Sequence, residues 1–448
     1  MKYEMYPISY FIFHISYFIC MLEIIDLRGL TTPPVGGWNI ARPVFDNTIL
    51  QQKVKSILED VRQNGDAAIA TYTSQFDHVS LTNIAVSQEE IDESGRLLTN
   101  ELKQAIQTAA NNISVFHEKQ ITKIEVIETM PGVQCWRKSV GIEKVGLYIP
   151  GGTAPLFSTI LMLGIPAQLA GCKEIVLCSP PNKKGKLHPA ILYAASVAGI
   201  TKVYKVGGVQ AIGALAYGTE TIPKTYKVFG PGNQYVTCAK QLIQQEGIAI
   251  DMPAGPSEVC VLADETANAA FVAADLLSQA EHGVDSQVVL VTCEEEVIKE
   301  VVTELTRQVA LLSRSDIALK ALENSKAIIV KNVELAINLV NEYAAEHLII
   351  SCQYASEIGE KIINAGSIFL GNYSPESVGD YASGTNHTLP TNGFAKAYSG
   401  VSVDSFVKKI TFQHLTKKGL ANIGNTVIEM ATAEGLDAHA NAVKVRLC

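Results

Sequence analysis

Residues 251–283 read DMPAGPSEVCVLADETANAAFVAADLLSQAEHG and contain a loop, a strand and a helix in direct succession. Pro and Gly mark the loop, residues 259–263 form a short apolar run typical of a buried strand, and an alanine-rich helix follows. Gln279 and His282 lie three residues apart near the end of this helix, so their side chains share one face. A carboxamide oxygen and an imidazole that point to one place can hold a metal ion or a polar substrate. An ordinary polar helix end is the alternative.

The composition is that of a globular protein, since hydrophobic residues make up 47% and charged residues 18% of the 448 residues. A chain of this length can hold two or more domains, each with its own core. The formal net charge of −9 argues against a nucleic-acid-binding surface, which needs clustered Lys and Arg. We therefore expect a small-molecule ligand and no nucleic-acid partner.

The nine cysteines are scattered along the chain, and no two of them form a CxxC pair. This pattern predicts free thiols and a reducing compartment, and we expect the cytoplasm. Four of them lie in or beside apolar runs, where a free cysteine behaves as a small core residue: Cys172, Cys178, Cys260 and Cys293.

The first twenty residues differ in character from the rest of the chain. Residues 8–21 are apolar and aromatic, and Lys2 is their only basic flank. The run is short for a membrane span and lacks a small-residue cleavage site. We expect residues 1–20 to be a non-native or disordered extension ahead of a start at Met21, and we expect no membrane partner. A weak signal or an interfacial anchor is the alternative.

Strands alternate with helices over residues 148–257, which predicts βαβ units and a parallel sheet. Glycine-bearing turns follow three of the strands, at residues 149–155 (IPGGTAP), 207–208 (GG) and 230–233 (GPGN). Such turns meet at one edge of a parallel sheet, so they predict a ligand crevice in which backbone N–H groups could face phosphates. Tight turns without a ligand are the alternative. No GxGxxG or P-loop motif is present, so the spacing alone does not establish a dinucleotide site.

The second half of the chain repeats the alternation, which predicts a second α/β lobe and suggests an old duplication. After Gly371 the sequence predicts a loop-rich segment, a helix over residues 420–433 and an extended end over residues 442–447. So short a tail cannot hold its own core and should dock on a lobe or on another subunit. We therefore expect an α/β fold with two parallel-sheet lobes and a small C-terminal tail. The expected parts are residues 21–147 with 258–384 (first lobe), 148–257 (second lobe) and 385–448 (tail).

Two further places carry polar residues that could do chemistry. Glu346 and His347 are neighbours at a predicted helix-to-strand junction, where an acid and an imidazole can divide acid–base work. A capping His beside a solvated Glu is the alternative. Asp380 lies in residues 377–387 (SVGDYASGTNH), a polar loop that suits either a metal ligand or a plain Asx turn.

The C-terminal segment AEGLDAHA contains Glu434 and His439. A lone His in a tail is usually only solvated. Taken with the other candidates, however, it completes a set of two imidazoles, one carboxylate and one neutral oxygen. Such a set suits zinc and leaves coordination positions for a ligand. The members are Gln279, His282, Asp380 and His439.

Long motifs throughout the chain resemble those of the histidinol dehydrogenase family. They occur in one order from about Met21 to the C-terminus, which leaves little room for coincidence. The motifs are GLYIPGGTAPLFSTILMLGIPAQLAGC (146–172), VGGVQAIGALAYGTE (206–220), FGPGNQYVT (229–237), DMPAGPSEV (251–259), DLLSQAEHG (275–283), EHLII (346–350) and SPESVGDYASGTNHTLPT (374–391).

The resemblance implies an enzyme that oxidises L-histidinol to L-histidine through the aldehyde, in the last steps of histidine biosynthesis. The family uses two NAD molecules in turn and one zinc ion per site, and it works as a homodimer of chains with duplicated, incomplete Rossmann-like lobes. The C-terminal tail would then be the dimerisation segment, and the glycine turns of residues 148–257 would belong to the NAD-associated lobe.

The family's functional residues match positions of this sequence. Glu346 and His347 match the catalytic pair. Zinc ligands are implied for Gln279, His282, Asp380 and His439, the last donated across the dimer interface. Substrate contacts are implied for Ser257, Gln279, His282, His347, Asp380, His387, Glu434 and His439, and NAD contacts for Tyr148, Gln210 and Asn233.

The sequence departs from the family pattern at two places. Ala345 stands where a Pro is expected before Glu346, so we expect the preceding helix to end less sharply. Residues 1–20 have no counterpart. On the residues alone, two other classes stay open: a zinc hydrolase with Glu346 as its base, and a non-catalytic nucleotide-binding protein. The first has no use for the glycine turns, and the second has none for the polar cluster.

Overall fold

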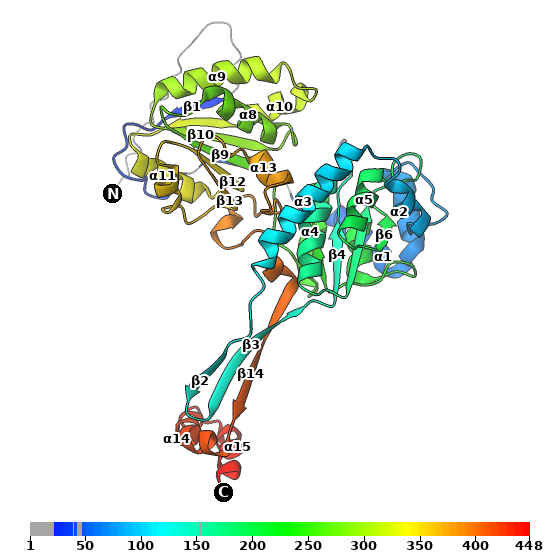
Figure 1. Cartoon of the computed structure of the whole chain (residues 1–448), viewed down its shortest axis with the longest axis vertical. Helices are drawn as coiled ribbons and strands as arrows, with labels where there is room; N and C mark the ends of the chain where they lie inside the picture. The colour runs from blue at the N-terminus through cyan, green and yellow to red at the C-terminus, as the bar shows by residue number, and fades with distance from the viewer. Residues whose placement is uncertain (1–21, 39, 43–46, 152–154) are drawn as a thin grey trace.

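The computed structural model describes residues 22–38, 40–42, 47–151 and 155–448. Figure 1 shows two α/β lobes side by side and a long arm that extends from them to the C-terminus. The expected extension over residues 1–20 lies outside the described residues, as does the middle of the first glycine turn. The predicted α/β class with parallel sheets is confirmed.

The first lobe is built on a parallel sheet between two helix layers. Its central strands are short apolar runs such as VCVLA, buried at every position, as expected when helices cover both faces. The strand order is β1-β11-β10-β9-β12-β13. The strands are β1 (Glu23–Asp26), β9 (Glu258–Ala263), β10 (Gln287–Thr292), β11 (Lys326–Ile329), β12 (His347–Ser351) and β13 (Ser367–Leu370). The helices are α8 (Ala269–Ala280), α9 (Glu295–Val309), α10 (Ser315–Glu323), α11 (Val333–Tyr343), α12 (Ala355–Gly359) and α13 (Glu376–Tyr381).

The second lobe has a smaller parallel sheet with the order β6-β5-β4-β7-β8, again between two apolar cores. Its strands are β4 (Lys144–Tyr148), β5 (Glu174–Ser179), β6 (Lys202–Lys205), β7 (Lys227–Phe229) and β8 (Ala249–Ile250). The helices that follow these strands are α4 (Phe157–Leu169), α5 (Pro189–Val197), α6 (Gly208–Tyr217) and α7 (Gln234–Gln245). Three helices from earlier in the chain also pack here: α1 (Asn47–Phe76), α2 (Gln88–Ser94) and α3 (Asn100–Glu118).

The two lobes share one topology. Numbered along the chain, both sheets have the strand order 3-2-1-4-5, and β1 is added beside β11 in the first lobe. This is a Rossmann-like order, in which a crevice opens at the carboxyl ends of the strands where the winding direction reverses. The predicted similarity of the two halves therefore extends from the alternation of elements to the order of the strands.

The expected division of the chain is corrected for residues 47–141. Helices α1, α2 and α3 were expected in the first lobe, but they pack on the second. The apolar face of α1, which includes Val54, Leu58 and Val61, packs against α6. The periodicity of an amphipathic helix shows that one face is buried, but it does not show which sheet receives that face. Within the described residues before β2, only the segment up to Arg42 joins the first lobe.

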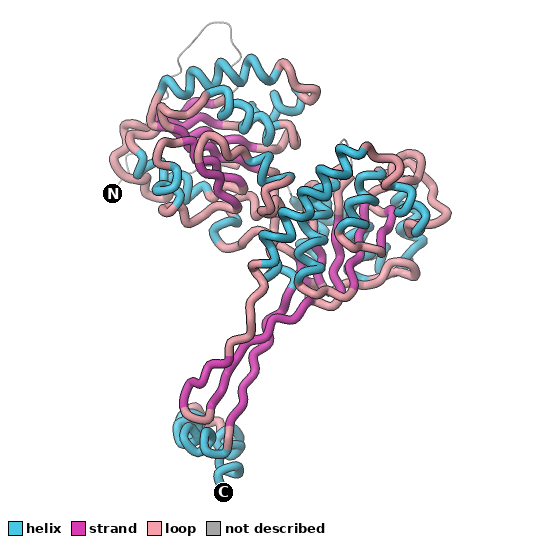
Figure 2. The backbone as a smooth tube through the Cα atoms, in the orientation of Figure 1, coloured by secondary structure: helices cyan, strands magenta, loops and turns pink. Residues whose placement is uncertain are grey.

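The arm is an antiparallel ribbon of three strands with a helical tip (Figures 1 and 2). β3 (Val133–Gly141) pairs with β14 (Val407–Leu415) along the whole length of both strands and with β2 (Val126–Met130) on its other side. The tip consists of α14 (Lys417–Ala433) and α15 (Asp437–Leu447). The loop that leads to the arm contains the short helices η1 (Phe394–Lys396) and η2 (Val403–Phe406).

Two predictions for the C-terminal part were wrong. Residues 407–415, expected in a loop-rich segment, form β14 by pairing with β3. The prediction failed because β3 lies more than 260 residues earlier in the chain, so the local sequence does not reveal the pairing. Residues 442–447 are helical in α15 rather than extended. That helix buries only Ala440, so its sequence has no clear apolar stripe to reveal it.

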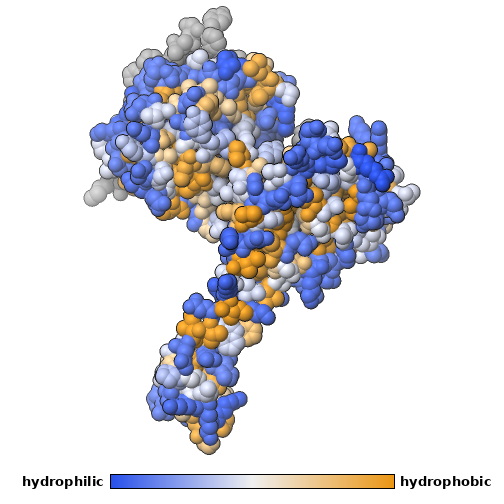
Figure 3. All heavy atoms as spheres, in the orientation of Figure 1, coloured by the Kyte–Doolittle hydropathy of each residue, from blue (hydrophilic) through white to orange (hydrophobic). Residues whose placement is uncertain are grey.

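The arm exposes apolar side chains on both its strands and its helical tip. Figure 3 shows several hydrophobic patches on the visible face. Val126, Ile127, Ile410, Phe412 and Met430 are all more than a third exposed. A ribbon this thin cannot enclose a core of its own. Among all the described residues, the arm included, no helix has the length and hydropathy needed to cross a membrane.

Candidate functional site

Gln279 and His282 lie at the carboxyl end of α8, which begins at its N-cap Asn268 and returns to the amino edge of the first sheet. Gln279 is fully buried, and its Nε2 atom lies 3.2 Å from Nδ1 of His282. Its Oε1 atom has no hydrogen-bond partner among the described residues. A buried carboxamide oxygen without a partner, beside an imidazole, is a donor set that fits a metal ion.

Glu346 and His347 lie where the chain enters β12, and they are only 6% and 3% exposed. Ala344 ends α11 just before them in the left-handed conformation, with φ 52°. The left-handed cap therefore ends the helix without the expected Pro. Glu258, the first residue of β9, contacts both side chains through its backbone. Its N–H donates to Oε2 of Glu346 at 2.9 Å, and its carbonyl lies 3.3 Å from Nδ1 of His347.

Asp380 reaches the same place from α13, a short helix where the sequence predicted a loop. Its Oδ1 atom lies 3.2 Å from Nε2 of His347. α13 is held against α8 by Glu376, whose Oε1 accepts a 2.6 Å hydrogen bond from Oγ of Ser278. Ser278 directly precedes Gln279, so this contact fixes Asp380 relative to the end of α8. Three segments that are far apart in the sequence thus converge on one cluster.

His387 lies in the loop after α13 and links the cluster to the second lobe. Its Nδ1 atom lies 2.9 Å from the carbonyl of Asp380, and its Nε2 lies 3.0 Å from Oγ1 of Thr159 on α4. The neighbouring Asn386 donates from Nδ2 to the carbonyl of Met162 on the same helix, at 2.6 Å. The cluster therefore lies at the junction of the two lobes.

Burial and nearby charges determine the protonation of the cluster. Burial raises the pKa of Glu346 to about 8. Burial lowers the pKa of His347, but the carboxylates of Glu346 and Asp380 outweigh this effect and raise it to about 10. Burial raises the pKa of Asp380, yet its hydrogen bond to His347 lowers it below the ordinary value. The group is thus a set of coupled acids and bases with shifted pKa values, as is typical of catalytic sites.

A cavity of about 1480 Å³ lies at the carboxyl edge of the second sheet, where the glycine turns predicted a crevice. Tyr148, Gln210 and Asn233 all line it. The hydroxyl of Tyr148 accepts a 3.2 Å hydrogen bond from the N–H of Gly208, and burial raises its pKa to about 12, so it keeps a proton to donate. Gly230 has φ 125°, and a Cβ there would collide with the carbonyl of Tyr148. The turn before Asn233 therefore requires glycine.

Glu434 and His439 are not part of this cluster within one chain. Both are exposed at the tip of the arm, where Figure 1 places α15 far from α8. Accordingly, in the described part of the chain no three His, Cys, Asp or Glu side chains are placed to hold a metal ion. Ser257 is half-buried and directly precedes Glu258, so it lies beside the cluster.

Sequence reasoning missed several residues that position the site. Glu258 forms a buried ion pair with Arg42, and Glu376 and Thr159 hold α13 and His387. One signal was available for Glu258. A carboxylate at the head of the otherwise apolar run EVCVLA needs a partner once the strand is buried. Its partner Arg42 lies 216 residues away, and nothing in the local sequence identifies it.

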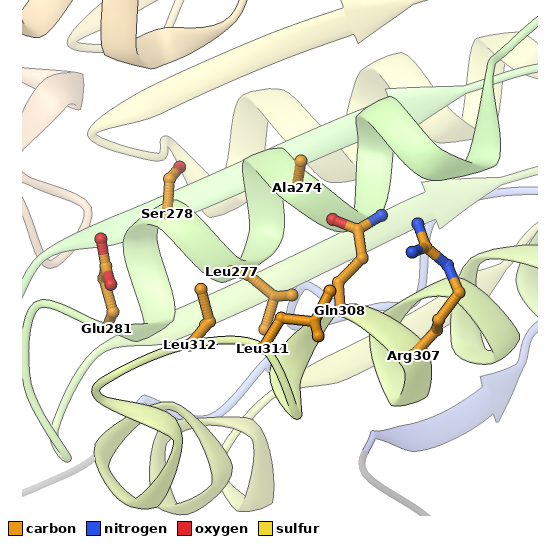
Figure 4. A pocket seen from close by; sticks show the side chains of 8 residues that line it. All are labelled: Ala274, Leu277, Ser278, Glu281, Arg307, Gln308, Leu311 and Leu312. Carbon is orange, nitrogen blue, oxygen red and sulfur yellow. The ribbon is translucent and has the colours of Figure 1, made fainter.

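A second, smaller cavity of about 400 Å³ lies between α8 and α9 (Figure 4). Its floor is apolar, with Leu277, Leu311 and Leu312, while Glu281 and Arg307 lie at its rim. Ser278 lines this cavity, whereas Gln279 and His282 do not. We assign it no part in the chemistry.

Comparisons with known proteins match almost the whole chain. The family model described as histidinol dehydrogenase matches residues 40–447. A histidinol dehydrogenase of Bacteroides thetaiotaomicron is 59% identical over 408 residues, which cover 91% of this chain and 95% of the relative. One of Bacteroides fragilis is 60% identical over 423 residues, or 94% and 99% of the two chains. The crystal structure of histidinol dehydrogenase from Elizabethkingia anophelis matches with a TM-score of 0.93 and 54% identity, covering 96% of this chain and 99% of that one.

Proposed function

The chain belongs to the histidinol dehydrogenase family, the oxidoreductases of histidine biosynthesis, and from that premise we propose that it oxidises L-histidinol to L-histidine with NAD as the oxidant. The observation that carries this proposal is the meeting of Glu346, His347 and Asp380 at the end of α8. That cluster is linked through His387 and Thr159 to α4, which starts two residues after Pro155 at the wall of the cavity. Acid–base groups and a nucleotide-sized cavity are what a dehydrogenase needs.

We assign a zinc ion to Gln279, His282 and Asp380 of one chain together with the partner subunit's His439. The partnerless Oε1 of Gln279 and the neighbouring imidazole support this assignment. A zinc ion held there would supply positive charge and would help to orient the polar groups of L-histidinol. Ser257 and His387 of the same chain, and the partner subunit's Glu434, would contact the substrate around it.

His347 acts on the alcohol in this mechanism. The carbonyl oxygen of Glu258 can only accept a hydrogen bond, so Nδ1 of His347 carries a proton. The carboxylates of Glu346 and Asp380 hold a second proton on Nε2 and raise the pKa to about 10. A cation bound to Asp380 would cancel the charge that holds this second proton, and Nε2 would then work as the base. Nε2 removes the hydroxyl proton of L-histidinol while the carbinol carbon gives up its hydride to NAD. The product is an aldehyde, which stays bound because it is reactive.

Glu346 acts on the aldehyde. Its pKa of about 8 lies near the working pH, where a carboxylate is an effective general base. Glu346 removes a proton from the water that adds to the aldehyde carbon, and the resulting hydrate gives up a second hydride to a second NAD. Two bases with separate tasks explain why an acid and an imidazole are neighbours in the sequence. NAD would contact Tyr148, Gln210 and Asn233 in both steps.

We propose that the active form is a homodimer in which each arm completes the site of the other chain. Three observations support this arrangement. One chain lacks a third strong metal ligand at the end of α8 within its described part. His439 is exposed at the tip of a projecting arm. The arm carries exposed apolar residues such as Ile127 and Phe412 without a core of its own. We expect the dimer to work in the cytoplasm.

An activity assay with metal analysis tests the proposal. Purified protein is mixed with L-histidinol and NAD, and NADH absorbance is followed to completion alongside a metal count per chain. We expect two NADH per L-histidinol and loss of the activity after a chelator removes the metal. A zinc hydrolase would release no NADH, and a non-catalytic nucleotide-binding protein would bind NAD without turnover. Either result would refute the dehydrogenase.

A further inference from the structure

Glu258 has an unusual place at the amino edge of the first sheet. The ladder between β9 and β12 begins at the pair Val259 and His347, so Glu258 lies one residue before its first pair. Its N–H donates to the carboxylate of Glu346 instead of to a strand carbonyl. Its carbonyl meets Nδ1 of His347. The backbone of this single residue therefore holds both members of the catalytic pair.

The side chain of Glu258 is fixed just as firmly. Nε of Arg42 donates to its Oε1 at 2.5 Å, and a terminal nitrogen of Arg42 donates to its Oε2 at 3.1 Å. The backbone N–H of Asn392 adds a third hydrogen bond to Oε1, at 3.1 Å. The side chains of Arg42 and Glu258 are 17% and 3% exposed, so the pair is shielded from water.

Arg42 is itself anchored to the sheet. It donates to the carbonyl of Tyr343 at 2.5 Å, and its guanidinium lies 4.1 Å from the centre of the Tyr343 ring. The preceding residue, Ala41, accepts a 3.0 Å hydrogen bond from Nε2 of Gln287 at the start of β10. Residues 41–42 thus cross the amino edge of the sheet directly behind the catalytic pair.

We propose that the ion pair of Arg42 and Glu258 is a positioning device that sets the orientation of Glu346 and His347, and that neither residue contacts the substrate. The inference rests on the proposed function. A buried ion pair contributes little net stability compared with an apolar pair, because both ions lose their hydration. A carboxylate at the head of an apolar strand is thus hard to explain by stability alone. The position of Glu258 is explained if its backbone must stay fixed while Glu346 and His347 take up and release protons.

Three variants test the proposal, each assayed with L-histidinol and with the supplied aldehyde. Arg42→Met leaves the Glu258 carboxylate without a charged partner, with only the N–H of Asn392 still donating to it. Glu258→Gln keeps the shape but removes the charge. Arg42→Lys keeps the charge but loses the paired donors of the guanidinium. We expect kcat for both substrates to fall about 10- to 100-fold in Arg42→Met and Glu258→Gln, because small misplacements of catalytic groups cost this much. KM for NAD should stay within about threefold, since its proposed contacts Tyr148, Gln210 and Asn233 line the cavity of the second lobe. KM for L-histidinol should change less than kcat, since most of its proposed contacts lie on α8, on α13 and in the partner subunit. Arg42→Lys should recover part of the loss.

Lys326→Met is the matched control. Lys326 begins β11 at the same edge of the same sheet, and its ion pair with Glu23, with Nζ 2.5 Å from Oε2, likewise ties an early segment of the chain to a strand. It should keep its kcat, and it should lose less thermal stability than Arg42→Met because Glu23 is half exposed. Should Arg42→Met fail to fold, Glu258→Gln and Arg42→Lys decide the question.

The proposal is overturned if Glu258→Gln keeps kcat within about twofold, if the loss appears in KM rather than in kcat, or if Lys326→Met loses kcat to the same extent. The wild-type chain is assayed in parallel. If it releases no NADH from L-histidinol, the proposed function fails. If it does and the variants match it, only the positioning role fails.

Discussion

Nε2 of His387 lies 3.0 Å from Oγ1 of Thr159, and this contact joins the two lobes beside the cluster of Glu346, His347 and Asp380. The other ring nitrogen lies 2.9 Å from the carbonyl of Asp380 on the first lobe. One half-buried imidazole therefore touches both lobes. It relates the position of α4, near the cavity, to that of α13, which carries Asp380.

Replacing Thr159 tests this link. Thr159→Val keeps the shape of the side chain but removes the partner of Nε2 of the half-buried His387, which we expect to destabilise the fold by about 1 kcal/mol. Thr159→Ser keeps the hydroxyl and should be closer to wild type. Denaturant unfolding measures both. Equal stability of the valine and serine variants would show that the contact contributes nothing.

The donated histidine can be tested by mixing two inactive variants. His439→Ala and His347→Ala should each be inactive as homodimers. After the two are unfolded together and refolded, half of the dimers contain one chain of each kind, and each mixed dimer has one intact site. We expect about a quarter of the wild-type activity. No recovery, with mixed dimers verified by mass spectrometry, would mean that each chain uses its own His439.

If His347 and Glu346 act in different steps, their variants should slow different oxidation steps. His347→Ala should slow the oxidation of L-histidinol by a factor of about 10²–10⁴, as is usual when a general base is removed. Glu346→Ala should slow mainly the oxidation of supplied aldehyde. Single-turnover measurements of NADH with each substrate separate the two steps. Normal turnover of the aldehyde by Glu346→Ala would mean that Glu346 has another role.

Tyr148 offers a test of the cavity. Tyr148→Phe removes the hydroxyl that accepts from the N–H of Gly208 and that could donate to NAD. We expect KM for NAD to rise about 5- to 10-fold, the equivalent of one hydrogen bond, with little change in KM for L-histidinol. Tyr204→Phe on the neighbouring strand β6 is the control, because Tyr204 is buried but does not line the cavity. Similar effects of both variants would argue against a specific contact.

Asp275 predicts how stability depends on pH. Burial raises the pKa of this carboxyl from 3.8 to about 7 in the folded state. The folded chain therefore holds the proton more tightly than the unfolded chain does, so the group favours folding at low pH and opposes it as pH rises to about 7. Asp275→Asn removes the charged form. With a chelator in the buffer, the free energy of unfolding of Asp275→Asn should exceed that of the wild type by roughly 2–4 kcal/mol at pH 8 and by almost nothing at pH 3.5.

Denaturant unfolding at several pH values measures this effect. Glu300→Gln on the exposed face of α9 is the control and should follow the wild-type curve. A gain for Asp275→Asn that is the same at every pH would mean that its cause is packing rather than proton binding.

The strands and helices of both lobes were predictable because their sequences carry strong local signals. Short apolar runs such as residues 259–263 and 287–292 are typical of buried strands, and their alternation with helices favours a parallel sheet. The glycine turns predicted the crevice at the second sheet, and Tyr148 and Asn233 indeed line one cavity. Glu346 and His347 were candidates because the two are adjacent in the sequence, and the structure places both in one buried cluster, while their catalytic role stays a prediction.

The remaining features depend on contacts that no local pattern records. β14 exists because β3 pairs with it, and α1 packs on the second sheet because its apolar face fits α6. Arg42 matters through Glu258, far along the chain. The short helix that carries Asp380 is stabilised by the contact between Glu376 and Ser278. These are tertiary effects that override weak local preferences.

The strand order common to both lobes has a consequence for how such a chain can evolve. The first lobe uses the amino edge of its sheet, where Glu258 and His347 begin their strands, whereas the second uses the carboxyl edge, where Tyr148 ends β4. The two sheets of like strand order thus have the cavity and the polar cluster at opposite edges. If NAD binds in the cavity as proposed, substitutions that line the cavity can change the affinity for NAD while the acid–base groups at the other sheet stay in place. The two properties could then evolve one at a time within a single polypeptide.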